Sequence, residues 1–321
     1  MDAEDGTVPL DETYAETVNY HGRIFQRHAL DSKIYYAPID DEEIARLGNM
    51  HTMLRTVFDN RLIFPPVVRP RRILECGFGA AHWAVDVAEQ YPDAKVVGLD
   101  ISPHMIPEEM PNNLDLQVDD LNGDMSSWPR FTFPSNHFDV VHSQMMAGGI
   151  HATRWPSYLQ DMYRVLQPGG WCQLVEIYFN AQSDNGTLSP DHALSRWSSG
   201  YLDAMHPQKD PRAALRLKDW MRNAGFTDIE SRLLTLPMCS WPTGMSKIQR
   251  LSCYQTACNL PSDKAEFRSA RPCDRGPKCH QRQSTALFDG LVSLHAYSRD
   301  ASGRLSAHGS SSKKRGDKPV V

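Results

Sequence analysis

The sequence lacks the features that mark several classes of protein. No apolar run approaches the roughly 20 residues that a membrane-spanning helix needs. The opening residues, MDAEDGTVPLDETYAET, are acidic where a secretory signal peptide is basic and then apolar. The 7 cysteines are scattered and form no close Cys-x-x-Cys pair, which argues against structural zinc and a disulfide framework. We therefore expect a cytoplasmic or nuclear protein that does not bind a membrane and has no metal site.

Positive charge is scarce in most of the chain and gathers at its end. Residues 244–321 carry 14 Lys and Arg against 6 Asp and Glu, whereas the whole chain has a net charge of −5. Residues 1–243 are therefore strongly acidic. Because nucleic-acid binding depends on basic surface, we expect this part to make no direct contact with nucleic acid.

The hydrophobic pattern divides the chain into four segments. Residues 1–18 are acidic and lack periodicity, which predicts disorder. Residues 19–70 include DDEEIARLGNMHTMLRTVFDNRLIF, whose apolar spacing predicts a helix, so we expect a helical cap. From 71 to 243, apolar runs alternate with helical patterns, which is typical of an α/β, Rossmann-like, mostly parallel sheet with helices on both faces. Residues 244–321 show no sustained period, which predicts a basic, disordered tail.

A glycine turn opens the third segment, in RRILECGFGAAHWAVDVAEQYPDAKVVGLD at residues 71–100. Gly77 and Gly79 stand between a predicted strand and a predicted helix, where glycine lets a ligand approach free backbone N–H groups. Asp100 ends the next strand, where a carboxylate accepts hydrogen bonds from ribose hydroxyls. A plain strand–turn–helix unit that binds nothing remains the alternative interpretation.

Carboxylates end three successive predicted strands. Glu75, Asp100 and the pair Asp119–Asp120 are placed to line the crevice where open α/β sheets bind ligands. Such an edge repels a pyrophosphate and attracts a cation. S-adenosylmethionine, which carries an adenosine, an amino group and a sulfonium, therefore suits it better than a dinucleotide. A nicotinamide-dependent dehydrogenase uses the same turn but fits the acidic edge poorly.

In order and spacing, these motifs resemble the class I S-adenosylmethionine-dependent methyltransferases, and more narrowly the fungal LaeA-like family. The resemblance covers about residues 19–243 and includes LECGFGAAHWAV, FDVVHSQMMAGGI, YRVLQPGGWCQLVEI and AGFTDIE. It implies the class I fold, S-adenosylmethionine as cofactor, and a small-molecule methyl acceptor from fungal secondary metabolism. The alternative is a nuclear regulator of metabolite gene clusters that acts through regulatory protein partners. The run SSSKKRGDK is then a candidate nuclear localisation signal, with a solvated charge run as the other reading.

The resemblance also implies the residues of the cofactor site. Asp100 would hold the ribose with Ile101 packed on the adenine, and Asp120 would accept from the adenine amino group. The full set implied for the cofactor is Glu75, Gly77, Gly79, Asp100, Ile101, Asp120, Leu121, Ser143 and Gln144.

No residue is marked by the sequence as catalytic. Methyl transfer is a displacement in which the cofactor carries the reactivity and the protein aligns the reactants. His142 and His151 flank SQMMAGGI and are candidates to deprotonate a hydroxyl acceptor, although packing explains each of them as well. Four residues are candidates for the substrate pocket, with core packing as the alternative: Tyr35, Tyr36, Met145 and Met146.

The chain departs from the family pattern D-x-G-x-G-x-G at two positions of the loop. Glu75 replaces the Asp and keeps its charge. Ala81 replaces the last Gly, and its methyl group is expected to crowd the helix start and weaken cofactor binding. Past residue 243 the family continues to a final apolar strand, and the polar tail predicts that this closing strand is missing here.

Overall fold

The computed structural model of the chain describes residues 9–123, 131–183, 188–237 and 289–298. Residues 1–8 and most of residues 244–321, both predicted to be disordered, lie outside these residues, and so does the SSSKKRGDK run. No helix in the described part of the chain is both long enough and apolar enough to cross a bilayer.

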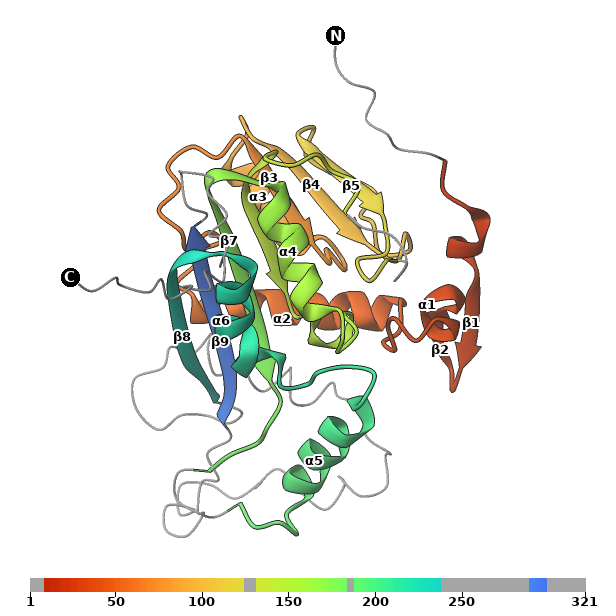
Figure 1. Cartoon of the computed structure of the whole chain (residues 1–321). Helices are drawn as coiled ribbons and strands as arrows, with labels where there is room; N and C mark the ends of the chain where they lie inside the picture. The colour runs from red at the N-terminus through yellow and green to blue at the C-terminus, as the bar shows by residue number, and fades with distance from the viewer. Residues whose placement is uncertain (1–8, 124–130, 184–187, 238–288, 299–321) are drawn as a thin grey trace, which may run out of the picture.

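Within the described residues, a seven-stranded sheet has the order β5-β4-β3-β6-β7-β9-β8 (Figure 1). The five strands from β5 to β7 in that order pair in parallel, and β9 runs antiparallel to both of its neighbours. Strand order reverses between β3 and β6, which is where open α/β sheets bind ligands. The strands are β3 (Arg72–Cys76), β4 (Lys95–Asp100), β5 (Leu114–Val118), β6 (Phe138–Gln144), β7 (Leu166–Tyr178), β8 (Thr227–Pro237) and β9 (Asp289–Ser298).

Helices cover both faces of this sheet. Because successive side chains of a strand point to opposite faces, neighbouring strand residues pack against different helices. Leu74 belongs to one core cluster with α4 (Trp155–Val165) and α6 (Ala213–Ala224). Ile73 belongs to another with α3 (His82–Gln90). On this second side α2 (Asp41–Val57) packs against β7. The predicted fold class is confirmed.

The prediction that the closing strand is missing is wrong. β9 pairs with β7, where Leu291 is opposite Tyr178, and also with β8. Its sequence alternates apolar Val292, Leu294 and Ala296 with polar residues, which is the period-2 pattern of a strand. The pattern spans only a few residues between long polar stretches, so it disappears when residues 244–321 are considered together.

The N-terminal segment is more ordered and less helical than predicted. Residues 9–18 were expected to be disordered, but they contain a 3₁₀ helix and the start of a β-hairpin. The hairpin turn is His21-Gly22, both with positive φ, which is the conformation that favours glycine in a two-residue turn. The elements before α2 are η1 (Glu12–Ala15), β1 (Thr17–Tyr20), β2 (Arg23–Gln26) and α1 (Arg27–Asp31).

Gln26 fixes the hairpin to the sheet. The residue is 2% exposed. Its Nε2 donates to the carbonyl oxygen of Ile101, just after β4, at 2.9 Å, and to that of Tyr14 at 2.8 Å. The cap is therefore held against the carboxyl end of β4, and Figure 1 shows it at one side of the molecule.

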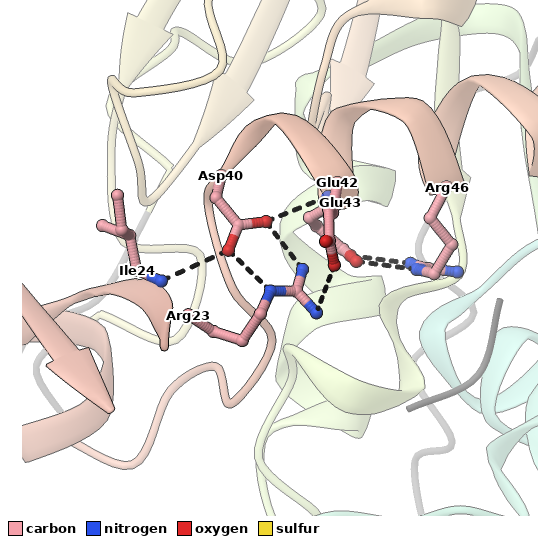
Figure 2. Close-up of polar contacts among 6 residues, drawn as sticks. All are labelled: Arg23, Ile24, Asp40, Glu42, Glu43 and Arg46. Atoms are coloured by element: carbon pink, nitrogen blue, oxygen red, sulfur yellow. Dashed lines mark hydrogen bonds and ion pairs between the residues drawn. The ribbon is translucent and has the colours of Figure 1, made fainter. Parts of the chain in front are cut away.

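Asp40 joins the hairpin to α2 (Figure 2). It is the N-cap of the helix and accepts a hydrogen bond from the backbone N–H of Glu43 at 3.1 Å. The guanidinium of Arg23 donates to both of its oxygens, at 2.7 and 2.6 Å, and the N–H of Ile24 donates at 3.2 Å. The bond from Arg23 holds the pKa of Asp40 at about 2.

Replacing Asp40 with alanine is expected to lower the free energy of unfolding at pH 7 by about 2 kcal/mol, because it removes the cap and an ion pair. The folded-state pKa lies below the ordinary 3.8, so this stabilisation is present above that value and is lost as the pH falls to about 2. Urea unfolding at pH 7 and at pH 2 measures both effects. Asp41→Ala, an exposed neighbour in the same helical turn, is the control. Equal losses in the two variants would contradict the role of Asp40.

Candidate active site

A cavity of about 1180 Å³ opens at the carboxyl edge of the parallel strands. Its walls come from the ends of β3, β4, β6 and β7, the segment after β5, the N-terminal cap, α2 and α5 (Ala193–Met205). Figure 1 shows α5 apart from the sheet, beyond this edge. Small-molecule sites usually measure roughly 300–1,000 Å³, so there is room for a cofactor and a second molecule.

Most of the residues that the sequence singled out meet in this cavity. The ends of β3, β4 and β7 and the segment after β5 bring the carboxylates together, as the parallel topology requires. The predicted residues that line the cavity are Tyr35, Tyr36, Glu75, Gly77, Gly79, Asp100, Ile101, Asp120, Leu121, Gln144, Met145 and Met146.

Ser143 and His142 do not reach the cavity, so neither residue lies where the prediction placed it. Each is 0% exposed. Ser143 lies on the α4 face, with its Oγ 3.0 Å from the hydroxyl of Tyr158. His142 lies on the opposite face, stacked on Trp83 with 3.8 Å between ring centroids. Burial lowers the pKa of His142 to about 3. Both residues precede the end of β6, where side chains still point into the covered faces of the sheet, and only Gln144 reaches the rim.

His151 is not among the residues that line the cavity either. Its backbone pairs with Lys209, and its Nδ1 lies 3.4 Å from the Lys209 Nζ. Burial and the charge of Lys209 lower the pKa of His151. The structure therefore gives neither candidate histidine a position from which to act as a base in the cavity.

Lys209 fastens the cap to the rest of the cavity wall. Its ammonium is buried and donates to the carbonyl oxygen of Ile34 at 2.6 Å and to that of Gly149 at 2.9 Å. Ile34 belongs to the cap and Gly149 to the loop after β6. The residues that follow Ile34, including Tyr35, are thereby held over the cavity.

The glycine loop is held in shape by its neighbours. Gly77 has a φ of 82°, and a Cβ there would lie 2.1 Å from the Sδ of Met146. The positive φ favours glycine here, and a larger residue would also have to displace the side chain of Met146. The N–H of Gly79 donates to the Oδ2 of Asp100 at 2.8 Å, and the N–H of Ser102 donates to its Oδ1 at 3.1 Å. Asp100 therefore fixes both the loop and the tip of its own strand.

Ala81 does not narrow the cavity, which corrects the expectation from the sequence. It is the N-cap of α3, in the left-handed conformation with a φ of 59°. Its methyl group is fully buried in the core cluster that contains Ile73 and Trp83, and Ala81 is not a lining residue.

Replacing Ala81 with glycine is expected to leave the affinity for S-adenosylmethionine unchanged within about twofold. Glycine removes left-handed strain worth about 1 kcal/mol, and the loss of a buried methyl group offsets it by about the same amount. Calorimetric titration measures the affinity. Thermal unfolding measures the stability of the folded protein, on which the two effects should cancel. A tenfold gain in affinity would show that the methyl group crowds the cofactor after all.

The carboxylates of the cavity are held in an environment that favours a bound cation. Glu75 is 2% exposed, and its Oε2 is buried with no hydrogen-bond partner among the described residues. Burial, and then the nearby charge of Asp100, raise the pKa of Glu75 well above its ordinary value. Burial raises the pKa of Asp100 to about 6. A buried carboxylate oxygen without a donor fits the amino group of a cationic ligand, so these residues fit S-adenosylmethionine.

Glu176 is a cavity residue that the sequence analysis missed. It lies near the end of β7, and its carboxylate accepts hydrogen bonds from the backbone N–H groups of Met146 at 2.7 Å and Ala147 at 3.1 Å. Those groups begin η2 (Met146–Gly148), directly after Met145 with its φ of 60°. Glu176 therefore fixes the strained turn beside the glycine loop. The sequence pattern that could have identified it is an acid near the end of an apolar run, in LVEIYF. The same kind of pattern identified Glu75.

A second missed group comes from two helices. Trp197, Tyr201 and Met205 recur every four residues of α5, and all three line the cavity. Residues spaced by four lie on one face of a helix, so this spacing was the signal. Arg46 and Met50 of α2 line the cavity in the same way.

Known proteins are similar in sequence to this region. Residues 73–170 match the family model described as a methyltransferase domain. Methyltransferase pytC of Aspergillus terreus is 30% identical over 247 residues, which cover 75% of this chain and 72% of that protein. The chain belongs to the LaeA-like family of class I S-adenosylmethionine-dependent methyltransferases. The cofactor of this family is S-adenosylmethionine, as the resemblance implied.

The matched region covers less than two thirds of the length of two other relatives. The secondary metabolism regulator laeA of Monascus pilosus is 34% identical over 243 residues, which cover 73% of this chain and 62% of that protein. The protein-methionine methyltransferase laeA of Emericella nidulans is 29% identical, with coverage of 73% and 61%. A phosphoethanolamine N-methyltransferase of Haemonchus contortus, solved with S-adenosyl-L-methionine, aligns at 18% identity with a TM-score of 0.47, covering 79% of this chain and 52% of that one. That similarity is too distant to carry an inference about ligands.

Proposed function

We propose that this LaeA-like protein transfers the methyl group of S-adenosylmethionine to a small organic acceptor in fungal secondary metabolism. The observation that carries the proposal is one cavity lined by carboxylates at the strand ends and by aromatic side chains from the cap and α5, which we call its acid-lined half and its aromatic half. The names of the relatives, a methyltransferase and a secondary metabolism regulator, support the metabolic setting.

The residues of the acid-lined half divide the recognition of the cofactor. Asp100 would accept from the ribose hydroxyls, and Asp120 from the adenine amino group, with Ile101 and Leu121 as apolar surfaces for the ring. Glu75, with its unpartnered oxygen, would accept from the amino group of the methionine part. Bound there, S-adenosylmethionine supplies a methyl group activated by a sulfonium.

The aromatic half would hold and align the acceptor. Glu176 fixes the turn that carries Met145 and Met146, both of which line the cavity. Tyr35 and Tyr36 line the cavity on the side of the cap. Alignment and exclusion of water are the main contributions that a methyltransferase makes to rate, and these residues are placed to provide them.

The alternative is a regulator that works through protein partners, with the nucleus rather than the cytoplasm as its location. It is favoured by the relatives named as regulators and by the Emericella nidulans relative named for a protein substrate. The aromatic side chains that line the cavity favour a small organic acceptor instead, because they offer apolar contact area to a planar molecule.

Incubation with methyl-labelled S-adenosylmethionine and an extract of the source organism tests the proposal. The expected result is label in the small-molecule fraction, absent with Asp100→Ala and retained with Asp115→Ala, whose side chain lies on β5 away from the cavity. Label confined to protein, or no label from a protein that binds the cofactor, would favour the regulator.

A further inference from the structure

The end of β7 and helix α5 are held together by hydrogen bonds at the cavity. The Oγ of Ser198 on α5 donates to the carbonyl oxygen of Phe179 at 2.8 Å and accepts from the N–H of Ala181 at 3.0 Å. Glu176 lies three residues before Phe179, so the Cα atoms of the two lie within about 11 Å of each other. Both residues line the cavity. A carboxylate and an aromatic ring therefore come from one short segment that also fixes α5.

Three aromatic rings pack together at this junction. The ring of Tyr201 stacks on that of Trp197 with 5.7 Å between centroids and 15° between planes, and Phe179 packs edge-on to Tyr201 at 5.2 Å. All three line the cavity. Burial, and then the nearby charge of Glu176, raise the pKa of Tyr201. We refer to Phe179, Trp197 and Tyr201 as the aromatic wall.

Glu176 keeps acceptor capacity for a ligand. It is 1% exposed, and each carboxylate oxygen accepts one backbone N–H, from Met146 or from Ala147. No side chain in the described part of the chain pairs with it. Each oxygen of a carboxylate can accept more than one hydrogen bond. A buried carboxylate that lacks a cationic partner favours a ligand that brings one.

The arginines of the cavity wall are already neutralised by acids. Arg23 pairs with Asp40 and Arg46 pairs with Glu43, and no lysine lines the cavity. S-adenosylmethionine has a net charge of only about +1 at neutral pH, because its carboxylate offsets its amino group. A second ligand with a positive charge is therefore favoured over one with a negative charge. The lining carboxylates with no ion-pair partner among the described residues are Glu75, Asp100, Asp119, Asp120 and Glu176.

We propose that the methyl acceptor is an amine, bound as its ammonium ion by the Glu176 carboxylate and the aromatic wall. This inference rests on the proposed function and names the chemical class of its acceptor. Aromatic faces attract ammonium groups, and a carboxylate forms its strongest hydrogen bonds with charged donors. The wall also offers apolar contact to the carbon skeleton of the amine.

The same carboxylate accepts the proton that must leave before the nitrogen can react. The ammonium loses this proton to Glu176. The nitrogen lone pair then forms a bond to the methyl carbon while the carbon–sulfur bond breaks, and the electron pair of that bond stays on sulfur. The product leaves as a methylated ammonium ion, and Glu176 releases its proton to solvent. Burial raises the pKa of Glu176 to about 8, which suits a base that works near neutral pH.

Calorimetric titration with benzylamine, benzyl alcohol and benzoate tests the proposal, because the three probes share one ring and differ in charge. The protein is first saturated with S-adenosylhomocysteine, which occupies the acid-lined half. At pH 8 the amine is expected to bind at least about tenfold more tightly than the alcohol, and benzoate more weakly than either. Glu176→Gln should remove the advantage of the amine over the alcohol. Trp197→Leu should reduce that advantage, since it removes one face for the ammonium.

Glu230→Gln is the matched control, because Glu230 is a strand glutamate that is exposed, pairs with Arg232 and does not line the cavity. It should leave the order and the ratio of the three affinities unchanged. Equal affinities for the amine and the alcohol in the parent protein, or tighter binding of benzoate, would refute the inference even if the variants failed to fold. An advantage of the amine that survives Glu176→Gln would refute it as well.

Two outcomes separate this inference from the proposed function. If S-adenosylhomocysteine binds and none of the three probes does, the inference fails alone. If S-adenosylhomocysteine does not bind, the proposed function fails together with it.

Discussion

Replacing Asp100 with alanine is expected to weaken the binding of S-adenosylmethionine by about 100-fold or more. The substitution removes the acceptor for the ribose hydroxyls, and hydrogen bonds to a charged group contribute about 1.5–3 kcal/mol each. It also releases the N–H groups of Gly79 and Ser102, so the glycine loop loses its support. Isothermal titration calorimetry at pH 7.5 measures the loss.

Two further measurements make this prediction specific. Asp100→Asn keeps a side-chain oxygen for the loop and should lose about tenfold in affinity, since the charge alone is removed. In the parent protein the affinity should fall as the pH drops through about 6, because protonation removes the charged acceptor. Asp115→Ala should match the parent. Unchanged affinity in Asp100→Ala would remove Asp100 from the ribose role.

Replacing Glu75 with glutamine is expected to act in opposite directions on stability and on binding. Glutamine keeps the shape but no longer requires a buried, incompletely paired carboxylate to ionise, so the free energy of unfolding at pH 7 should rise by about 2 kcal/mol. The affinity for S-adenosylmethionine should fall by at least about tenfold, because the acceptor for its amino group is lost.

The pH dependence of this gain in stability has a defined sign. Burial raises the folded-state pKa of Glu75 above the ordinary 4.5, so the carboxyl group destabilises the folded protein increasingly as the pH rises above that value. The advantage of Glu75→Gln should therefore be absent at pH 4 and grow toward pH 7. Glu89→Gln, on the exposed face of α3, is the control. A less stable variant with unchanged cofactor binding would show that Glu75 is a structural residue only.

The acidic part of the site could be predicted because it follows from topology. Glu75, Asp100 and Asp120 each end or directly follow a short apolar strand, and parallel strands bring their carboxyl ends to one edge. Ser143 could not be placed in the same way, since a shift of one residue along a strand moves a side chain from the rim to a covered face. The structure places the end of β6 at Gln144, one residue further than that prediction needed.

The aromatic half of the cavity depends on contacts between distant parts of the chain. Tyr35, Arg46 and Tyr201 belong to the cap, α2 and α5, and no local pattern determines how these elements fold over the sheet. Lys209 and Gln26 are polar residues that sequence reasoning assigns to the surface, yet their buried hydrogen bonds hold the cap in place. β9 was missed for the converse reason, since its strand pattern is local but short.

Calorimetric titration of the parent protein with S-adenosylmethionine and with NAD⁺ tests the central claim most directly. The acid-lined half of the cavity should bind the sulfonium cofactor at a single site with micromolar affinity. It should give no heat with NAD⁺, because it repels the pyrophosphate. Binding of NAD⁺ with equal affinity, or no heat with S-adenosylmethionine, would contradict the account.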